Sequence, residues 1–258
     1  MQPFFGEYFI FWVFGGFVVI AGIVAYIAGV QQAKRVSDMR GLAAADGFEF
    51  FLEGLVEKPR GFFASLVAGQ SDPIVGALDR FHPFNFGTDK HPYNVLVKAV
   101  GDRNIYAMDY IAETLENDGK TARRRKHRFT VVAIRHGFIW PYVRLTPESF
   151  EHRVARMFGM KELTLESEEF NRKYFVEVED DRSAYDILHP KSIDFLLRIP
   201  ARDWQMSNMY LVVAAIGEMS VQEIRRVIQD MNDFIDLLPD YVRQDRGFQP
   251  KWTGALDL

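Results

Sequence analysis

The sequence predicts an α+β fold, with one N-terminal transmembrane helix followed by a cytoplasmic domain that has a mainly antiparallel sheet and flanking helices. Three observations support this prediction: a charge-free apolar run near the N-terminus, short apolar segments separated by turn residues, and one capped amphipathic helix near the C-terminus. We divide the 258 residues into an outer N-terminus (1–7), a transmembrane helix (8–33), juxtamembrane helices and loops (34–93), a cytoplasmic α+β domain (94–242) and an extended tail (243–258).

The transmembrane helix is predicted because the sequence has no charged residue from Tyr8 to Ala33. Its apolar part, Tyr8 to Val30, would be about 35 Å long as a helix, which exceeds a hydrocarbon core of about 30 Å. No basic residue precedes the run, which argues against a cleaved signal peptide. Glu7 lies before the run and basic residues follow it, so the positive-inside rule places the N-terminus outside the bacterial inner membrane and the remaining chain in the cytoplasm. The basic residues are Lys34, Arg35 and Arg40.

Small residues form a stripe on this helix that favours contact with another helix. Gly15, Gly22 and Gly29 recur every seven residues, so they drift by only about 20° per repeat, and Ala25 lies close to the same stripe. Small side chains allow a second helix to approach closely. The alternative is that Gly is simply common in membrane helices.

Aromatic residues gather at the outer end of the helix, where amphipathic rings favour the membrane interface. Flat apolar rings there also pack against lipid, pigment or protein. We predict no cofactor, and we leave contact with a bound lipid or pigment open. The interfacial aromatic residues are Phe5, Tyr8, Phe9 and Trp12.

The predicted domain begins with turn-rich sequence and continues as a sheet. Gly47 is expected to end the first helix in a left-handed conformation. The Pro- and Gly-rich segment from Gly54 to Asn94 predicts one or two short helices and long loops. Apolar runs between turn residues then predict antiparallel strands, with Gly137 separating two of them. The expected strands are 94–100, 105–115, 128–135, 139–145, 163–165, 174–178 and 210–216.

Helices are predicted beside this sheet, and the last one has the clearest signal. Ser220 and Glu223 have the spacing of a capping box, in which each side chain accepts a hydrogen bond from a backbone N–H at the helix start. An apolar stripe follows, and Pro239 ends the helix. The expected helices cover 149–158, 192–197 and 220–238.

Composition and missing motifs exclude several classes of function. The chain has no cysteine, which rules out disulfides, thiolate metal sites and cysteine nucleophiles. Its net charge is −4, which lacks the basic excess of a nucleic-acid-binding protein, so we expect no nucleic-acid partner. The sequence contains no phosphate-binding loop, dinucleotide-binding fingerprint, nucleophile elbow or zinc-protease motif. His82 and His91 lie near Asp79 and Asp89, but loop spacing does not define a ligand geometry, and we predict no metal site.

Two charged segments are candidates for a site. The only basic run favours contact with anionic headgroups or an acidic partner, or else it forms a solvated hairpin end. A group of acidic residues flanks an expected strand at 170–179, but paired carboxylates need a cleft that separates their pKa values, so we expect a structural role. The basic residues are Arg123, Arg124, Arg125, Lys126 and Arg128, and the acidic residues are Glu166, Glu168, Glu169, Asp180 and Asp181.

A further pattern runs through Leu165 to Leu197, at Glu166, Phe170, Asn171, Tyr174, Val176, Asp180, Asp181, Ala184, Leu188, Pro190 and Leu197. This pattern resembles a family of bacterial membrane-anchored proteins that carry a domain of unknown function, over roughly residues 128–197. The resemblance rests mainly on structural positions, and it implies membrane anchoring without an activity to transfer to any residue. The overall layout is also similar, in topology only, to the H subunit of photosynthetic reaction centres.

The missing catalytic motifs, the small-residue stripe and the aromatic outer end together favour a noncatalytic accessory or scaffold subunit. Such a subunit would stabilise a larger integral membrane complex, photosynthetic or respiratory, with its helix beside a partner span and its domain over that partner's cytoplasmic face. The expected partners are other integral membrane subunits, and anionic lipid is a further candidate. The competing hypotheses are a membrane-tethered enzyme that uses the carboxylates near Glu166 to Asp181, and an anionic-membrane binding module that uses Arg123 to Arg128.

Overall fold

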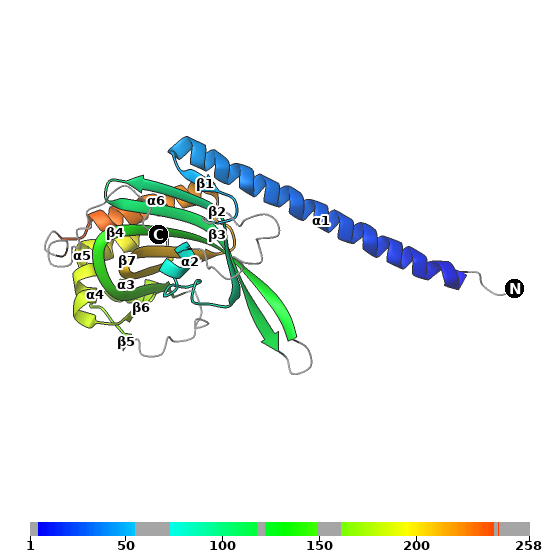
Figure 1. Cartoon of the computed structure of the whole chain (residues 1–258). Coiled ribbons are helices and arrows are strands. Elements are labelled where there is room, and N and C mark those ends of the chain that lie inside the picture. Colours follow the sequence, from blue (N-terminus) through cyan, green and yellow to red (C-terminus); the bar gives the residue numbers. More distant parts are fainter. Residues whose placement is uncertain (1–4, 55–72, 118–121, 149–160, 240–241, 243–258) are drawn as a thin grey trace.

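The computed structural model describes residues 5–54, 73–117, 122–148, 161–239 and 242. One long N-terminal helix projects from a domain in which helices flank a sheet (Figure 1). The described elements are α1 (Phe5–Asp46), β1 (Glu49–Phe51), α2 (Pro73–Ala77), β2 (Thr88–Val100), β3 (Arg103–Asn117), β4 (Ala122–Pro147), β5 (Lys161–Glu162), α3 (Glu168–Lys173), β6 (Tyr174–Val178), α4 (Asp181–Ile187), α5 (Pro190–Arg198), β7 (Asp203–Ile216) and α6 (Val221–Asp236).

The seven-stranded sheet is antiparallel at each described pairing. Its strand order is β1-β2-β3-β4-β6-β5, and β7 pairs with β4. The predicted hairpin is present as β2 and β3, although its turn is shorter than expected because Val100 already pairs with Arg103. Gly101 in this turn has a φ of 60°, a conformation that Gly adopts without strain. The predicted α+β fold, with a long apolar N-terminal helix and a mainly antiparallel sheet, is confirmed.

The longest strand, β4, corrects one prediction. We expected Gly137 to separate two strands, but β4 continues for 26 residues through this position. Its first half pairs with β3 and β7, and its second half pairs with β7 and β6. Between the halves the register with β7 shifts around Trp140, which lies opposite Asn208, a residue with a φ of 52°. The extra residues of β4 therefore form a bulge that bends the strand instead of a turn that ends it.

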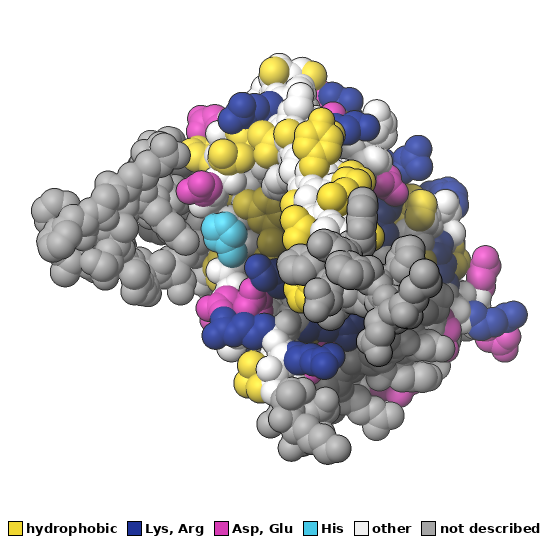
Figure 2. Space-filling model, turned by 90° about the vertical axis from the view of Figure 1, so that its right-hand side faces the viewer, with side chains coloured by type: hydrophobic (Ala, Val, Ile, Leu, Met, Phe, Trp, Pro, Cys, Tyr) yellow, Lys and Arg dark blue, Asp and Glu magenta, His cyan; other side chains and the backbone are white. Residues whose placement is uncertain are grey.

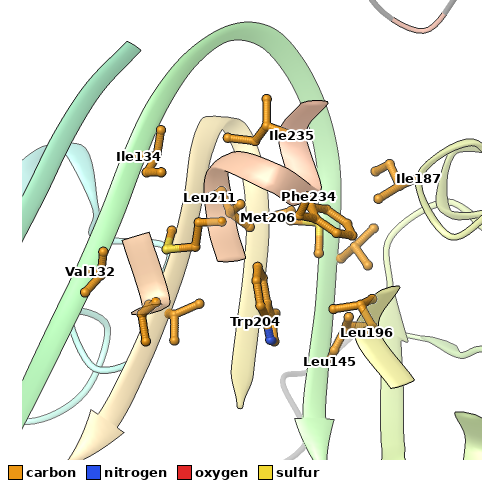
Figure 3. Close-up of a cluster of buried hydrophobic side chains, with 14 of the residues drawn as sticks. Val132, Ile134, Leu145, Ile187, Leu196, Trp204, Met206, Leu211, Phe234 and Ile235 are labelled. Carbon is orange, nitrogen blue, oxygen red and sulfur yellow. The ribbon is translucent and has the colours of Figure 1, made fainter. Parts of the chain in front are cut away.

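Two apolar clusters cover the two faces of the sheet. The larger cluster joins the sheet to α1, α4, α5 and α6, and the smaller cluster joins it to α2. Figure 3 shows part of the larger cluster inside the arch of β4, where Trp204 of β7 and Phe234 of α6 lie between the two arms of the strand. Ile105 of β3 enters the larger cluster and its neighbour Tyr106 enters the smaller one. Because successive side chains of a strand point to opposite faces, both faces of β3 are buried.

The domain takes in more of the chain than the expected range 94–242. Strand β1 pairs with β2, and β2 itself begins at Thr88. Leu78 and Phe81 are also buried, in the smaller apolar cluster. The expected boundary at 94 is therefore too late, because strand pairing already begins at Glu49. We call the part of the chain from Glu49 onward the sheet domain.

Two predicted elements differ in position from the observed ones, and two others lie outside the described residues. The strand expected at 163–165 is found at 161–162 as β5. Residues 170–173, the start of the strand expected at 170–179, lie instead in α3, because the Ser167 hydroxyl caps this helix by accepting a hydrogen bond from the Phe170 N–H. The strand expected to follow is present as β6. The helix expected at 149–158 and the tail at 243–258 fall outside the described residues.

The predicted signals at helix ends are confirmed. Helix α1 ends at Asp46, and Gly47 follows with a φ of 71°. At the start of α6, the Ser220 Oγ accepts from the Glu223 N–H at 3.2 Å, and the Glu223 carboxylate accepts from the Ser220 N–H at 2.7 Å. The capping box is therefore complete.

Candidate functional site

The outer segment of α1, Val13–Val30, is exposed along its whole length. Within the described chain, α1 is the one helix long and apolar enough to cross a membrane, and none of its most apolar window, with a mean hydropathy of 2.4, is buried. Phe14 and Phe17 are 69% and 75% exposed. Lipid or protein must cover so large an apolar surface. The aromatic residues predicted to lie at the membrane interface belong to α1, but their side chains lie outside the described part; they are Phe5, Tyr8, Phe9 and Trp12.

The small-residue stripe on this segment is open. A Cβ atom added at any of its three glycines would meet no atom within 4 Å. Arg35, Met39 and Leu42 of the same helix pack against the sheet domain. At 100° per residue, the mean direction of the three glycines differs from the mean direction of these three residues by about 130° around the helix axis. The stripe therefore points away from the chain's own domain. It consists of Gly15, Gly22, Ala25 and Gly29.

The inner segment of α1, Lys34–Asp46, is fixed to the sheet by a buried ion pair. Arg35 is 6% exposed and Asp109 of β3 is 0% exposed. The Arg35 Nε and Nη2 atoms donate to the two oxygens of the Asp109 carboxylate at 2.9 and 2.7 Å. Burial opposes the charge on Arg35, but hydrogen bonding with Asp109 and the charge of that carboxylate outweigh it and raise the pKa of the guanidinium. Arg35 is therefore charged at any physiological pH, and its charge is paired.

Several polar groups around this ion pair form hydrogen bonds with it. Asn94 Nδ2 donates to Asp109 at 2.9 Å, and the Thr130 hydroxyl donates to it at 3.0 Å. Arg35 Nη1 donates to the carbonyl oxygen of Met219 at 2.7 Å, and the Met219 N–H donates to Thr130 Oγ1 at 3.1 Å. One network thus joins α1 to β2, β3, β4 and the loop before α6.

A second set of hydrogen bonds joins the end of α1 to the domain. The Asp46 carboxylate accepts two hydrogen bonds from Arg225 of α6, at 2.6 and 3.0 Å. Lys98 of β2 donates to the Asp46 carbonyl oxygen at 2.6 Å. Met39 and Leu42, which lie between Arg35 and Asp46 in the helix, are buried in the larger cluster. The helix and the sheet domain therefore form one packed unit without a flexible linker.

A cleft of about 1010 Å³ lies where α1 leaves the sheet domain. One wall is the α1 segment 28–38, the other is the end of the sheet, and the loop 217–220 before α6 completes the lining. Gln31, the first polar residue after the apolar run, lines the cleft, which therefore opens at the level where the apolar part of α1 ends. Sequence reasoning missed this cleft because its walls come from separate elements. The residues from the sheet are Tyr93, Ile111 and Arg128.

The predicted basic run lies on the β3–β4 hairpin, and acidic neighbours pair with much of it. Arg124 contacts Asp89 at 2.9 Å, and Arg125 contacts Glu116 at 3.0 Å. Lys126 and Arg124 both contact Glu113, at 3.4 and 3.5 Å. Figure 2 views the end of the molecule from which α1 projects, and basic and acidic side chains are interspersed on it. The members of the run without a salt bridge in the described chain are Arg123 and Arg128.

The predicted acidic candidates lie on the surface of the described structure. Glu166, Glu168, Glu169, Asp180 and Asp181 are all exposed, and none lines a described cleft. Among the described residues, no three His, Asp or Glu side chains are placed to hold a metal ion.

A second buried polar group, which sequence reasoning also missed, joins the loop at His82 to β4 and β7. Arg144 donates to the two Asp203 oxygens at 2.8 and 2.9 Å. Gln205 Nε2 donates to Asp203 at 3.1 Å and to the His82 carbonyl oxygen at 2.9 Å. Burial, helped by the charge of Arg144 and opposed by that of Asp203, lowers the pKa of His82 to about 4. The imidazole is therefore neutral near pH 7, as expected of a structural contact.

Comparison with known proteins shows the fold and no family. No protein-family model matches the chain, and no curated protein matches it. Among solved structures, the chain is similar to the crystal structure of the mycobacterial trehalose monomycolate transport factor A, with a TM-score of 0.53 and 14% sequence identity. The match covers 79% of this chain and 96% of that one. At this identity the likeness shows a shared architecture, an antiparallel sheet with flanking helices.

Proposed function

We propose that this chain is a single-pass accessory subunit of a larger integral membrane complex, with its sheet domain in the cytoplasm. The observation that carries the proposal is the joint within α1, by which we mean the continuous helical connection between its exposed outer segment and its fixed inner segment. The outer segment offers an open small-residue stripe, while the buried pair of Arg35 and Asp109 fixes the inner segment to the sheet. A flexible linker would let the domain diffuse about its anchor, whereas this joint sets the domain's position relative to whatever α1 binds.

Charge supports the proposed orientation. Glu7 precedes the apolar run, and exposed Lys34 and Arg40 follow it. Basic residues near the end of a membrane helix remain in the cytoplasm. The N-terminus would then lie outside the bacterial inner membrane.

The direction of the stripe refines the expected arrangement. A partner span that packs on Gly22 would lie on the side of α1 that faces away from the sheet domain. The domain would then lie beneath the membrane surface beside α1, and not directly beneath the span that packs on the stripe. Other parts of the partner complex remain free to contact it.

The structural neighbour is named a transport factor, and its likeness supports the architecture of the proposal. No observation on the acidic residues favours the competing enzyme hypothesis. The hairpin of β3 and β4 projects from the domain on the same side as α1 (Figure 1), which favours membrane contact by Arg123 as a supplement to anchoring.

The experiment compares two substitutions of the same kind on two faces of α1. Gly22→Leu fills the stripe, whereas Gly16→Leu adds the same side chain about 120° away, where a Cβ atom also meets nothing. Each variant is expressed in place of the native protein, extracted in mild detergent and analysed on a sizing column. We expect Gly22→Leu to release the chain from its partner and Gly16→Leu to remain bound. Equal co-purification of both variants would contradict the proposal.

A further inference from the structure

The cleft between α1 and the end of the sheet lies at the depth of lipid headgroups, provided that α1 spans the membrane as proposed. The apolar run ends at Val30, and Gln31 and Gln32 line the cleft. The interfacial layer extends roughly 5 to 8 Å beyond the hydrocarbon core, and α1 rises about 6 Å from Gln31 to Arg35. The cleft therefore opens into the headgroup layer.

The cleft also faces away from the proposed partner. Its α1 residues point, on average, about 160° round the helix from the glycines of the small-residue stripe. A helix packed on the stripe would leave the cleft open. The bilayer on the other side of α1 is then the medium that meets it.

Both signs of charge line this cleft. Lys34 of α1 and Arg128 of β4 supply cations, and Asp38 and Glu218 supply carboxylates. All four side chains are exposed, and none of them forms a salt bridge within the described part of the chain.

The other charged side chains of the lining already have partners. Arg35 is held by Asp109. Glu223 accepts the Ser220 N–H at the start of α6. The open charges are therefore two cations and two carboxylates, a set that matches a ligand with one charge of each sign.

We propose that the cleft binds a zwitterionic phospholipid headgroup that carries a phosphate and a primary ammonium, as in phosphatidylethanolamine. Lys34 and Arg128 contact the phosphate, and Asp38 and Glu218 accept hydrogen bonds from the ammonium. Phosphatidylglycerol has no cation for the carboxylates, which then repel its phosphate. Phosphatidylcholine has a cation without an N–H donor, so it cannot make these hydrogen bonds.

The test measures lipid binding to the full-length protein, purified in detergent and delipidated, by native mass spectrometry. We expect phosphatidylethanolamine to bind at least about fivefold more tightly than phosphatidylglycerol or phosphatidylcholine. The double variant Lys34→Gln/Arg128→Gln should weaken all three lipids, by about fivefold per removed charge. The double variant Asp38→Asn/Glu218→Asn should weaken phosphatidylethanolamine alone.

A matched control removes two exposed cations from α4 and α5. Arg182→Gln/Lys191→Gln lies outside the cleft lining and should bind phosphatidylethanolamine as the native protein does. Thermal unfolding of each variant checks that the domain is intact. Equal or tighter binding of phosphatidylglycerol, or unchanged binding by Asp38→Asn/Glu218→Asn, would overturn the proposal.

Two further comparisons distinguish a lipid from a soluble ligand, and failure of the cleft proposal from failure of the proposed function. If soluble phosphoethanolamine displaces the lipid at equal concentration, the cleft serves a soluble ligand and the lipid assignment is wrong. The purified chain contains no partner span, so lipid binding is measured independently of the release caused by Gly22→Leu. If the purified chain shows no headgroup selectivity but Gly22→Leu alone releases the partner, only the cleft proposal is refuted. If the chain is selective but Gly22→Leu and Gly16→Leu co-purify equally, only the proposed partner contact at the small-residue stripe is refuted.

Discussion

The outer and inner segments of α1 belong to one continuous helix but have opposite surroundings. Phe17 of the outer segment is 75% exposed, whereas Met39 and Leu42 of the inner segment are 0% and 1% exposed. The outer segment has no charge, while the inner segment brings Arg35 into a buried position. A buried charge is tolerated only when it is paired and hydrogen-bonded, and Asp109 meets both conditions. One helix is thus suited to lipid at one end and to protein at the other, and an ion pair fixes the joint.

The largest expected effect comes from breaking this ion pair. Asp109→Ala leaves the Arg35 guanidinium buried without a counter-charge, and it should lower the free energy of unfolding by about 3 to 5 kcal/mol. Urea unfolding of the full chain in detergent, followed by circular dichroism, measures the change. Asp46→Ala is the control, because it removes a more exposed pair with Arg225 and should cost much less stability than Asp109→Ala. Equal losses in the two variants would mean that the buried pair does not fix the joint.

The next effect compares one truncation in each segment. Leu42→Ala removes a fully buried side chain from the larger apolar cluster and should destabilise the sheet domain by about 3 kcal/mol. Val18→Ala, where the side chain is 69% exposed, should leave the unfolding of the domain unchanged. Thermal unfolding of both variants in the same detergent gives the two values. A domain that responds equally to both would remove the distinction between the segments.

Acid should weaken the sheet domain and spare the charge-free outer segment. Burial lowers the pKa of His82 to about 4 and that of His136 to about 3, helped by the charges of Arg144 and Arg103 respectively. Both values lie below the unfolded value of about 6.5, so below that pH the unfolded chain binds more protons than the folded one. Stability is therefore complete above about pH 6.5 and declines as the pH falls towards 4 and 3.

Each of these histidines should contribute a loss of about 2 kcal/mol at pH 5 relative to pH 7. Urea unfolding at the two pH values measures the difference. His136→Gln should reduce the difference in the free energy of unfolding between pH 5 and pH 7 by the contribution of that histidine. A native protein whose stability is the same at pH 5 and pH 7 would show that the two imidazoles are not held neutral.

The smallest expected effect lies next to the joint. Ser220→Ala removes the hydroxyl of the capping box at the start of α6 and should cost about 1 kcal/mol. Ser220 follows Met219, whose carbonyl oxygen accepts a hydrogen bond from Arg35. The loss of stability should therefore appear in the same unfolding transition that Asp109→Ala affects. Ser220→Asp, which can still cap the helix, should retain most of the stability.

Much of the fold could be predicted from the sequence because its signals are local. The apolar run, the stop at Gly47 and the capping box of Ser220 and Glu223 each lie within a few residues of the feature they specify. The continuity of β4 could not be predicted in this way. A Gly between two apolar runs is compatible with a turn or a bulge, and the pairing with β7, distant in sequence, decides between them.

The candidate site was harder to predict because it depends on distant contacts. Arg35 and Asp109 are 74 residues apart, and the sequence around Arg35 indicates only the positive flank of a membrane helix. One signal was present: Asp109 interrupts the apolar strand Ile105–Leu115, and an acid in a strand buried on both faces requires a cation. Nothing local identifies which cation that is.

The most direct test of the central claim, that α1 and the sheet domain form one rigid unit, measures a distance between them. The chain has no cysteine, so spin labels can be placed by Ile20→Cys and Tyr185→Cys, at positions 62% and 50% exposed. Electron paramagnetic resonance in lipid nanodiscs then gives the distribution of distances between the labels. We predict a single narrow distribution that broadens when Asp109→Ala breaks the joint. A broad distribution in the otherwise native chain would contradict the account, because it would mean that a flexible tether joins the helix to the domain.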